Sequence, residues 1–524
     1  MYIKNILLSI LVVLISIGFA SSQIVFQKTY GGPSYDIGYA VQQNFDGGYI
    51  LAGAQHSFSL GTYDDYVIRT NEYGDTLWTR TYGDSLDEFA YSVKQTPDGG
   101  FIICGYTASF GAGNNDVYLI RINSSGDTLW TRTYGGVNDD EGNAVAVTND
   151  GGFMIIGNTK SYGAGNDDVY MIRTNSAGDT LWTKIFGGSG EDQARSMNKT
   201  DDGGYIITGF TNSYGQGNGD VLLIKTDSSG NILFTKTYGW IDIEEGKWGE
   251  QTGDGGYALI GVSGIGVTNV YFIKTNAQGD TVFTRMFGGI SATLDLGYSL
   301  HQTNDGGYIL AGSTRDINLG DYNIYMVRLD NNYDTLWTRL FSGTLNEEPY
   351  ALIPTSDGGF AIAGYTESTG AGHNDMYLIK FDSLGNGGCN QSNPFSIVSN
   401  IPIYTNSPTP LVSSGGVVGS TETMVGSNAI VTTLCSAVGT KNIRTNNLIN
   451  IYPNPANDAV TIHFESGITN YELRIKDVMG NEIYSHLFAG NDAIINVSKW
   501  SEGVYFYEVK GEKETAGGKL VIQK

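Results

Sequence analysis

The sequence predicts an all-β protein: a seven-bladed β-propeller closed by its N-terminal strand, followed by a C-terminal β-sandwich. The first observation is composition, because the chain is rich in Gly (73 residues) and Tyr (34 residues) and poor in amphipathic helical runs. The second is a repeat whose length indicates a supersecondary unit stabilised by packing against copies of itself. The turn Asp-Gly-Gly-Tyr/Phe recurs at a step of 52 residues, once 51, starting at Asp46, Asp98, Asp150, Asp202, Asp254, Asp305 and Asp357.

The first 22 residues have the layout of a cleavable export signal. Lys4 precedes an apolar run over residues 6–17, and small residues follow at 20–22. The run is too short for a membrane span, and no later stretch reaches the length needed to cross a bilayer. We therefore expect a mature protein that begins near residue 23 and carries no transmembrane segment.

Each copy of the repeat contains four predicted strands. In the second copy these are residues 91–95, 101–105, 116–121 and 128–134. Asp and Gly in the turn between the first two strands tolerate the positive φ that tight hairpins require. Four antiparallel strands are the content of one propeller blade.

The two ends of the repeat region complement each other. The last copy ends near residue 386 without a fourth strand, whereas residues 24–32 match the fourth strand at 76–83. We therefore predict a propeller over residues 23–388 whose last blade combines residues 351–385 with the strand 24–32. An open solenoid would need capping repeats, and none is evident.

The order of strands in each copy resembles that of WD40-type and quinoprotein-type propellers, although the diagnostic Trp-Asp dipeptide is absent. One large aromatic residue recurs in the fourth strand of each copy, and we interpret it as packing between outer strands. The residues in this slot are Phe26, Trp78, Trp130, Trp182, Phe234, Phe283 and Trp337.

Residues 446–524 lack the repeat and instead show short stretches of alternating residues, typical of strands, that suggest a small β-sandwich. They contain a Tyr-Pro-Asn-Pro start at Tyr452, a turn at Gly480, the Gly503-Val504-Tyr505 strand and a terminal Lys-Leu-Val strand. In this order the motifs closely resemble the type A sorting domain of the type IX secretion system of Bacteroidetes. The resemblance implies recognition by outer-membrane secretion machinery, and a protein that is secreted or held on the outer cell surface.

Residues 389–445 are predicted to form a polar linker, because they are rich in Ser, Thr and Gly. Cys389 and Cys435 bracket most of this segment, and in an exported protein we expect them to form a disulfide. The third cysteine, Cys104, lies in a strand-like run and is interpreted as a small buried apolar residue.

The formal net charge of −24 disfavours nucleic acid and anionic membranes as partners, since like charges repel. Glycans, surface proteins and cations remain open. None of the five histidines has metal-ligand spacing, and no nucleophile elbow or phosphate-binding loop is present. We predict no catalytic residues, no metal site and no cofactor, with calcium kept as a candidate.

A second acidic register lies on the predicted first strands, ten residues before each turn motif. These carboxylates could form a multivalent ligand-binding ring, or each could accept hydrogen bonds from the connecting loop of its own blade. The seven residues are Asp36, Glu88, Asp140, Asp192, Glu244, Asp295 and Glu347.

A third register precedes the predicted third strands, with Asp at five positions and Asn at Asn269 and Asn323. Such loops can bind calcium, but none has a complete oxygen-ligand motif, so turn capping is the preferred interpretation. The aspartates are Asp65, Asp116, Asp168, Asp220 and Asp375.

Trp248 departs from the repeat, because the other copies have Ala or Ser at this position. A bulky ring there must either protrude, as a stacking platform for a sugar, or displace a neighbour. Trp248 is therefore grouped with the acidic register as a candidate ligand-binding residue.

These observations predict an exported, non-enzymatic binding or adhesion protein whose ligand is a glycan or a surface protein. Two alternatives remain open: a secreted propeller enzyme that degrades polysaccharide, and a structural component of the cell surface.

Overall fold

The computed structural model describes most of the chain from residue 23 onward. The described ranges are 23–59, 62–288, 293–316, 320–392, 397–399, 404–406, 411–413, 417–419, 424–426, 430–437, 449–452, 458–464, 471–477, 481–488, 492–510 and 515–522. These ranges contain strands and turns but no helix, and hence no helix that could span a membrane. The predicted export signal lies outside the described residues. The chain divides into two compact units, residues 1–437 and 438–524.

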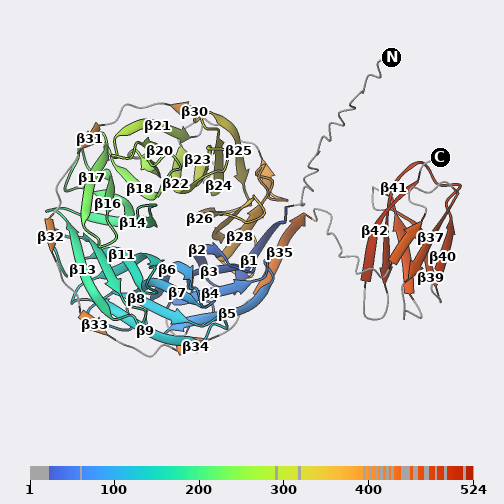
Figure 1. The fold of residues 1–524 in the computed structure, drawn as a ribbon, viewed down its shortest axis with the longest axis horizontal. Helices are drawn as coiled ribbons and strands as arrows, with labels where there is room; N and C mark the ends of the chain where they lie inside the picture. The colour runs from blue at the N-terminus through green and yellow to red at the C-terminus, as the bar shows by residue number, and fades with distance from the viewer. Residues whose placement is uncertain are drawn as a thin grey trace, which may run out of the picture. The chain divides into compact units, whose positions relative to one another are not determined.

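In the described part of the first unit, seven antiparallel sheets of five strands each lie side by side around a common centre (Figure 1). We number them sheets 1 to 7, beginning with the sheet that contains β2. The first strands lie nearest the centre: β2 (Asp36–Gln43), β6 (Glu88–Gln95), β10 (Asp140–Val147), β14 (Asp192–Lys199), β18 (Glu244–Gln251), β22 (Thr293–Gln302) and β26 (Glu347–Pro354).

The second and third strands form the buried middle of each sheet. The second strands are β3 (Tyr49–Gln55), β7 (Phe101–Thr107), β11 (Phe153–Thr159), β15 (Tyr205–Thr211), β19 (Tyr257–Ser263), β23 (Tyr308–Asp316) and β27 (Phe360–Thr366). The third strands are β4 (Asp64–Thr70), β8 (Asp116–Ile122), β12 (Asp168–Thr174), β16 (Asp220–Thr226), β20 (Asn269–Thr275), β24 (Tyr322–Leu329) and β28 (Asp375–Phe381).

The fourth strand of sheet 7 comes from the start of the described chain. β1 (Val25–Gly31) pairs antiparallel with β28, and Phe26 lies opposite Lys380. This is the pairing that the sequence predicted for residues 24–32. The other fourth strands are β5 (Thr76–Gly83), β9 (Thr128–Gly135), β13 (Thr180–Gly187), β17 (Ile232–Gly239), β21 (Thr281–Gly288) and β25 (Thr335–Phe341).

Each sheet also has a fifth strand, which the sequence analysis did not predict. Short strands within residues 391–437, a segment we call the belt, pair with the fourth strands in reverse order around the rim (Figure 1). Most of the segment predicted as a linker therefore extends the sheets. The belt strands, from sheet 6 back to sheet 1 and then to sheet 7, are β29 (Gln391–Ser392), β30 (Ile397–Ser399), β31 (Tyr404–Asn406), β32 (Leu411–Ser413), β33 (Val417–Gly419), β34 (Met424–Gly426) and β35 (Ile430–Ala437).

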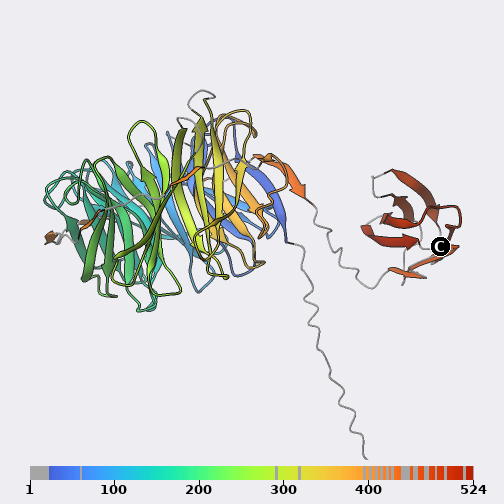
Figure 2. The same ribbon diagram turned by 90° about the horizontal axis from the view of Figure 1, so that it is seen from above.

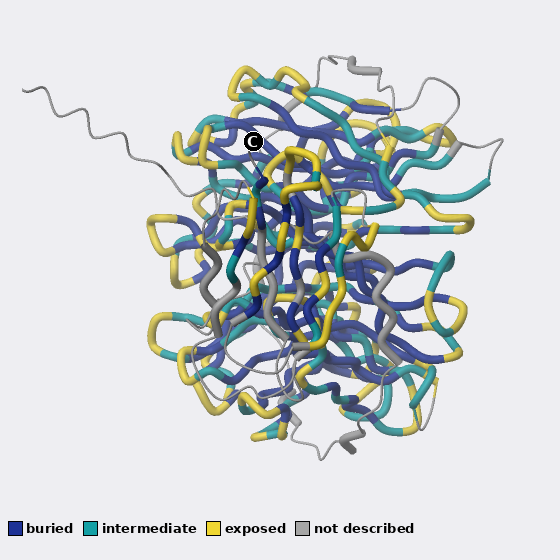
Figure 3. Tube along the Cα trace, turned by 90° about the vertical axis from the view of Figure 1, so that its right-hand side faces the viewer, coloured by how far each residue is buried: buried dark blue, intermediate teal, exposed yellow. Residues whose placement is uncertain are grey.

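Neighbouring sheets pack face to face, so most of the middle strands are buried along their whole length. Ile50 and Val67 of sheet 1 share a buried cluster with Phe101 and Ile103 of sheet 2. Strands buried on both faces lose the usual alternation of apolar and polar residues. Buried strands and exposed turns separate clearly in Figure 3, and Figure 2 shows the strands crossing the thickness of the unit.

The recurring aromatic residue of the fourth strand packs against the second strand and a turn of the next sheet. Trp78 contacts Phe101 of the next sheet edge to face, with ring centroids 6.3 Å apart. A Cβ added at Gly126, in a turn of that sheet with φ of +84°, would lie 3.2 Å from the Trp78 ring. The recurring aromatic residue therefore fits beneath a glycine turn of its neighbour.

Cys389 is disulfide-bonded, whereas Cys104 is a free, fully buried thiol, as its strand position predicted. The side chain of Cys435 lies outside the described side chains, so the Cys389–Cys435 pairing stays a prediction.

The second unit contains two antiparallel sheets that share one core. The core includes Val460, Leu473, Ile495 and Leu520. One sheet has the order β36 (Ile449–Tyr452), β37 (Ala459–Phe464), β40 (Asp492–Asn496), and the other has the order β39 (Glu482–Phe488), β38 (Tyr471–Lys476), β41 (Gly503–Lys510), β42 (Thr515–Ile522).

Candidate functional site

The seven carboxylates of the acidic register lie at or near the start of the first strands and are all buried, at most 3% exposed. Most of them bind the connections of their own sheet or the turn just before it. Asp140 accepts hydrogen bonds from the Gly136 amide at 2.7 Å and the Ser161 hydroxyl at 2.7 Å. Glu347 accepts equivalent bonds from Gly343 and Thr366, at 2.7 and 2.9 Å. These hydrogen bonds correspond to one of the two alternatives that the sequence left open, in which each carboxylate holds the loops of its own blade.

The third-strand register caps loops, as turn chemistry predicts. Asp116 accepts from the amides of Ala112 and Gly113, at 2.8 and 3.1 Å, and Asp168 accepts from Ala164 and Gly165 in the same way. Among the described residues, no group of three or more His, Cys, Asp or Glu side chains is placed to hold a metal ion.

The two acidic registers meet at the end of the fourth strands. A Cβ added at Gly239 would lie 2.1 Å from Asp220 Oδ1 and 2.7 Å from Glu244 Oε2. Burial, followed by the neighbouring charge of Glu244, raises the pKa of Asp220 to about 7. Such a pair holds a proton near neutral pH, because two adjacent buried carboxylates resist ionising together.

Trp248 is half-buried and packs against the core between sheets 5 and 6. Its ring meets His301 of sheet 6 edge to face, with centroids 5.8 Å apart. His301 is held in turn by Glu250, whose Oε2 lies 2.8 Å from Nδ1. The neighbouring Gly249 packs closely against sheet 4, because a Cβ there would lie 2.2 Å from the Thr208 hydroxyl.

A stronger candidate site is a set of seven residues that the sequence analysis did not single out. Every first strand carries a β-bulge at the same place, and one residue at the bulge has no partner in the register of the second strand. Bulges redirect a side chain and are common beside functional sites. We call these residues the bulge ring: Tyr39, Tyr91, Asn143, Arg195, Lys247, Tyr298 and Tyr350.

Four tyrosines form a continuous aromatic row in the bulge ring. Tyr298, Tyr350, Tyr39 and Tyr91 come from sheets 6, 7, 1 and 2, and successive ring centroids are 5.2, 5.0 and 5.1 Å apart. All four side chains are half-buried. Burial raises the pKa of each phenol, so the hydroxyls stay neutral.

The other three bulge residues are polar and belong to sheets 3, 4 and 5. Arg195 Nε and Lys247 Nζ each lie 2.7 Å from Glu245 Oε1. Burial lowers the pKa of Lys247, whereas the two cations outweigh burial and lower the pKa of Glu245. The bulge ring therefore joins an aromatic row to a charged, hydrogen-bonding segment.

A comparison of equivalent positions across the seven copies of the repeat could have found the bulge ring. Its members lie three residues after each carboxylate in the acidic register, and they vary from Tyr to Asn, Arg and Lys, whereas the residues beside them are Gly, Ala or Ser in most copies. The bulge itself is not visible in the sequence, because an added residue in one strand becomes apparent only when its partner is known.

Residues 450–523 match the family model of the secretion system C-terminal sorting domain. This confirms the predicted sorting domain and supports a secreted or cell-surface location. It also implies interaction with the type IX secretion machinery.

The remaining similarities are distant. A segment of 131 residues is 27% identical to the regulatory protein FlaEY of Caulobacter vibrioides, covering 22% of this chain and 13% of that protein. Sqt1 of Chaetomium thermophilum aligns over 64% of this chain and 81% of its own, with 11% identity and a TM-score of 0.38. An endo-arabinase of Bacteroides thetaiotaomicron aligns over 45% of this chain and 92% of its own, with 11% identity and a TM-score of 0.23.

Proposed function

We propose that this protein is an exported, non-enzymatic glycan-binding protein of the cell surface or its surroundings. In this proposal the first unit is a closed seven-bladed β-propeller, the second is a sorting β-sandwich, and residues 1–22 are a cleaved export signal. The bulge ring is the binding site. The single observation that carries the proposal is its row of four contacting tyrosines on the strands nearest the centre.

Closure of the propeller is supported by contacts between the last sheet and the first. Tyr49 and Leu51 of sheet 1 share a buried cluster with Ala363 and Leu378 of sheet 7. Phe26, in the fourth strand of sheet 7, meets Tyr49 edge to face at 6.1 Å, much as Trp78 meets Phe101. The junction of sheets 7 and 1 thus repeats the junction of sheets 1 and 2.

The chemistry of the bulge ring suits a carbohydrate. Sugar rings present apolar C–H faces that pack on aromatic side chains, and hydroxyls that need hydrogen-bond partners. The tyrosine row supplies the aromatic surface, while Asn143, Arg195 and Lys247 supply polar groups for the hydroxyls. The net charge of −24 argues against a polyanionic ligand.

Binding of the mature protein to a glycan array tests this proposal. Tyr350→Ala removes the ring that contacts both Tyr39 and Tyr298, and we expect at least a tenfold loss of affinity for any bound glycan. Tyr350→Phe keeps the stacking surface and is the matched control, so it should retain most of the affinity.

Two results would contradict the proposal. Unchanged binding by Tyr350→Ala would remove the bulge ring from the site. Release of shortened sugars from a bound polysaccharide would instead support the enzyme alternative. Repeating the array with calcium and with a chelator tests the candidate cofactor separately.

A further inference from the structure

The fifth copy of the repeat lacks an aromatic residue that other copies have in the connection between the second and third strands. We call this residue the plug. The connections between second and third strands at 108–115, 160–167 and 212–219 each contain eight residues, whereas 264–268 contains five. In sheets 3 and 4 this connection inserts a tyrosine against the end of the preceding fourth strand. Tyr162 donates to the Gly135 carbonyl at 2.9 Å, and Tyr214 donates to the Gly187 carbonyl at 2.6 Å.

A tryptophan accompanies the missing plug. Trp240 stands where sheets 3 and 4 use Gly136 and Gly188. A Cβ at either glycine would lie 2.9 Å from the hydroxyl of the plugging tyrosine. A side chain at this position would therefore meet the hydroxyl of a tyrosine plug, and the fifth copy has exchanged the plug for Trp240.

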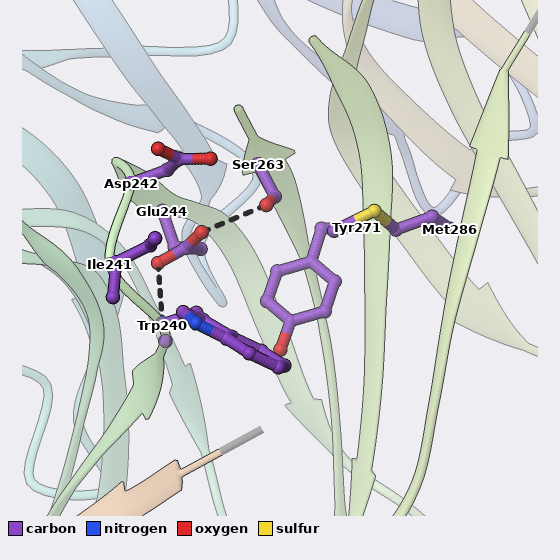
Figure 4. Close-up of a pocket in the computed structure, with 8 residues that line it drawn as sticks. Trp240, Ile241, Asp242, Glu244, Ser263, Tyr271 and Met286 are labelled. Atoms are coloured by element: carbon purple, nitrogen blue, oxygen red, sulfur yellow. Dashed lines mark hydrogen bonds between the residues drawn. The ribbon is translucent and has the colours of Figure 1, made fainter. Parts of the chain in front are cut away.

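The exchange leaves a cavity of about 280 Å³, lined by residues that include Gly239, Trp240, Asp242, Tyr271 and Met286. Gly239 corresponds to the glycines that bind the plugs in sheets 3 and 4. Figure 4 shows the Tyr271 hydroxyl directed toward the Trp240 ring, with Glu244 and Ser263 above them in this view. The Trp240 side of the cavity is open to solvent, because Trp240 is 36% exposed and Asp242 is also exposed.

Tyr271 marks the cavity as a site with an unused polar group. Its side chain is 1% exposed, and its hydroxyl has no hydrogen-bond partner within the described part of the chain. A buried hydroxyl without a partner is unfavourable, and a ligand that hydrogen-bonds to it would remove that cost. The other buried polar groups are already engaged, since Glu244 accepts from the Trp240 amide and the Ser263 hydroxyl, both at 2.9 Å.

The lining favours a cation over a sugar. Aromatic faces of Trp and Tyr attract ammonium groups, and the thioether of Met286 adds a polarizable wall. Asp242 and Glu244 line the cavity, Asp220 lies beneath Gly239, and no Lys or Arg is among the lining residues. A sugar would bury several hydroxyls against a lining that is largely apolar and in which Glu244 and Ser263 are already hydrogen-bonded to each other.

We propose that this cavity binds an organic ammonium group, supplied by a small quaternary amine or by a lysine side chain of a protein partner. The site is separate from the bulge ring and does not depend on glycan binding. Its volume is at the small end of ligand pockets, which fits one headgroup or one side chain.

Isothermal titration calorimetry of the mature protein tests the proposal with choline and with its neutral isostere 3,3-dimethylbutan-1-ol. We expect one ammonium site, with the neutral compound binding at least tenfold more weakly. n-Butylammonium and Nα-acetyl-lysine amide distinguish the sources, because a lysine site should prefer these primary amines to choline. Equal binding of choline and its isostere, or no binding of any ammonium compound, would overturn the proposal.

Two variants locate the site. Trp240→Gly restores the residue of sheets 3 and 4 and should lower ammonium affinity at least tenfold. Tyr271→Phe removes one hydroxyl and should lower it several-fold, whereas Tyr170→Phe, at the same position in sheet 3, should have no effect. Thermal unfolding checks that each variant is folded, and unchanged affinity in either cavity variant would refute the assignment.

Discussion

Each aspartate of the repeated turn binds a cation on the third strand of its own sheet. Arg121 Nη2 lies 2.6 Å from Asp98 Oδ2, and Lys225 Nζ lies 2.8 Å from Asp202 Oδ2. The cation is buried, while the aspartate is largely exposed in most sheets. The turn therefore neutralises a buried charge on the third strand. The seven cations are Arg69, Arg121, Arg173, Lys225, Lys274, Arg328 and Lys380.

Replacing one of these aspartates should destabilise the first unit. Asp98→Ala leaves the Arg121 guanidinium buried without its carboxylate and removes the acceptor of the Thr96 hydroxyl. The Asp98 side chain is 64% exposed, and solvent screening reduces the loss to about 1–2 kcal/mol. Urea unfolding measures it. Asp98→Asn keeps the turn acceptor, so a loss equal to that of Asp98→Ala would assign the effect to charge alone.

Two sets of aspartates give stability opposite dependences on pH. The turn aspartates Asp150, Asp202, Asp254 and Asp305 have a pKa lowered to about 2, with hydrogen bonds from a Thr and the paired cation outweighing burial. They stabilise the fold above pH 4, and this contribution is lost as the pH falls toward 2.

The buried aspartates act in the other direction. Burial raises the pKa of Asp220 to about 7 and that of Asp375 to about 6. Their folded forms bind more protons than their unfolded forms, so stability falls as the pH rises from about 4 to 7. We expect a higher unfolding temperature at pH 4.5 than at pH 7.5, and a decline again near pH 2.5.

Asp220→Asn tests the origin of the decline above pH 4. Asn occurs naturally at this register position as Asn269 and Asn323. The variant keeps an acceptor for the Gln216 amide, which donates at 2.8 Å, but has no carboxyl to ionise. Calorimetric scans should show a flatter profile between pH 4 and 7, and an unchanged slope would show that other groups cause it.

At the level of elements, the sequence predicted the four inner strands of each sheet but missed the fifth. Strands such as β8 are long apolar runs with turns on both sides, so composition reveals them. Belt strands such as β30 and β32 contain three residues each, too few for a period to appear. Their signal was a short apolar pair that recurs after six or seven residues at Val412, Val418 and Val425, and that is also present at Val398, fourteen residues before Val412.

The candidate site was also predictable from the sequence only in part. The position of Tyr39 could be read from the repeat, because the bulge residue follows the acidic residue, here Asp36, by three positions in every copy. Its contacts with Tyr91 and Tyr350 could not, since they join sheets distant in sequence. The burial of Asp36, at 0% exposure, could not be read from the sequence for a related reason, because it depends on loops that only the folded sheet brings together.

Neighbouring sheets are also joined by a buried hydroxyl. Tyr134, at the end of β9, donates to the Gly178 carbonyl of sheet 3 at 2.6 Å. Tyr134→Phe should cost about 1–2 kcal/mol, because the buried carbonyl loses its partner while the ring packing remains. Denaturant unfolding measures the change, with the exposed Tyr35→Phe as control, and equal stability of both variants would contradict the role of the bond.

At the scale of the molecule, the belt returns to its own beginning after pairing with all seven sheets. Its last strand, β35, pairs with β1, where Gln27 lies opposite Cys435. The Gln27 side chain donates to the carbonyls of Gly387 and Cys389, at 2.9 and 2.6 Å. Both ends of the belt therefore meet at one residue of the strand that completes sheet 7. We propose that Cys389 and Cys435 form the disulfide there.

The disulfide should stabilise the first unit by closing the belt into a loop. Loss of a crosslink over a chain segment of this length costs about 2–4 kcal/mol, mainly because the unfolded chain regains freedom. Cys389→Ser, Cys435→Ser and the double variant should lower the unfolding temperature by the same amount, since two partners of one bond are not additive. A reducing agent should destabilise only the unsubstituted protein. Additive losses, or an intact mass that shows reduced cysteines in the secreted protein, would mean that the belt is held by strand pairing alone.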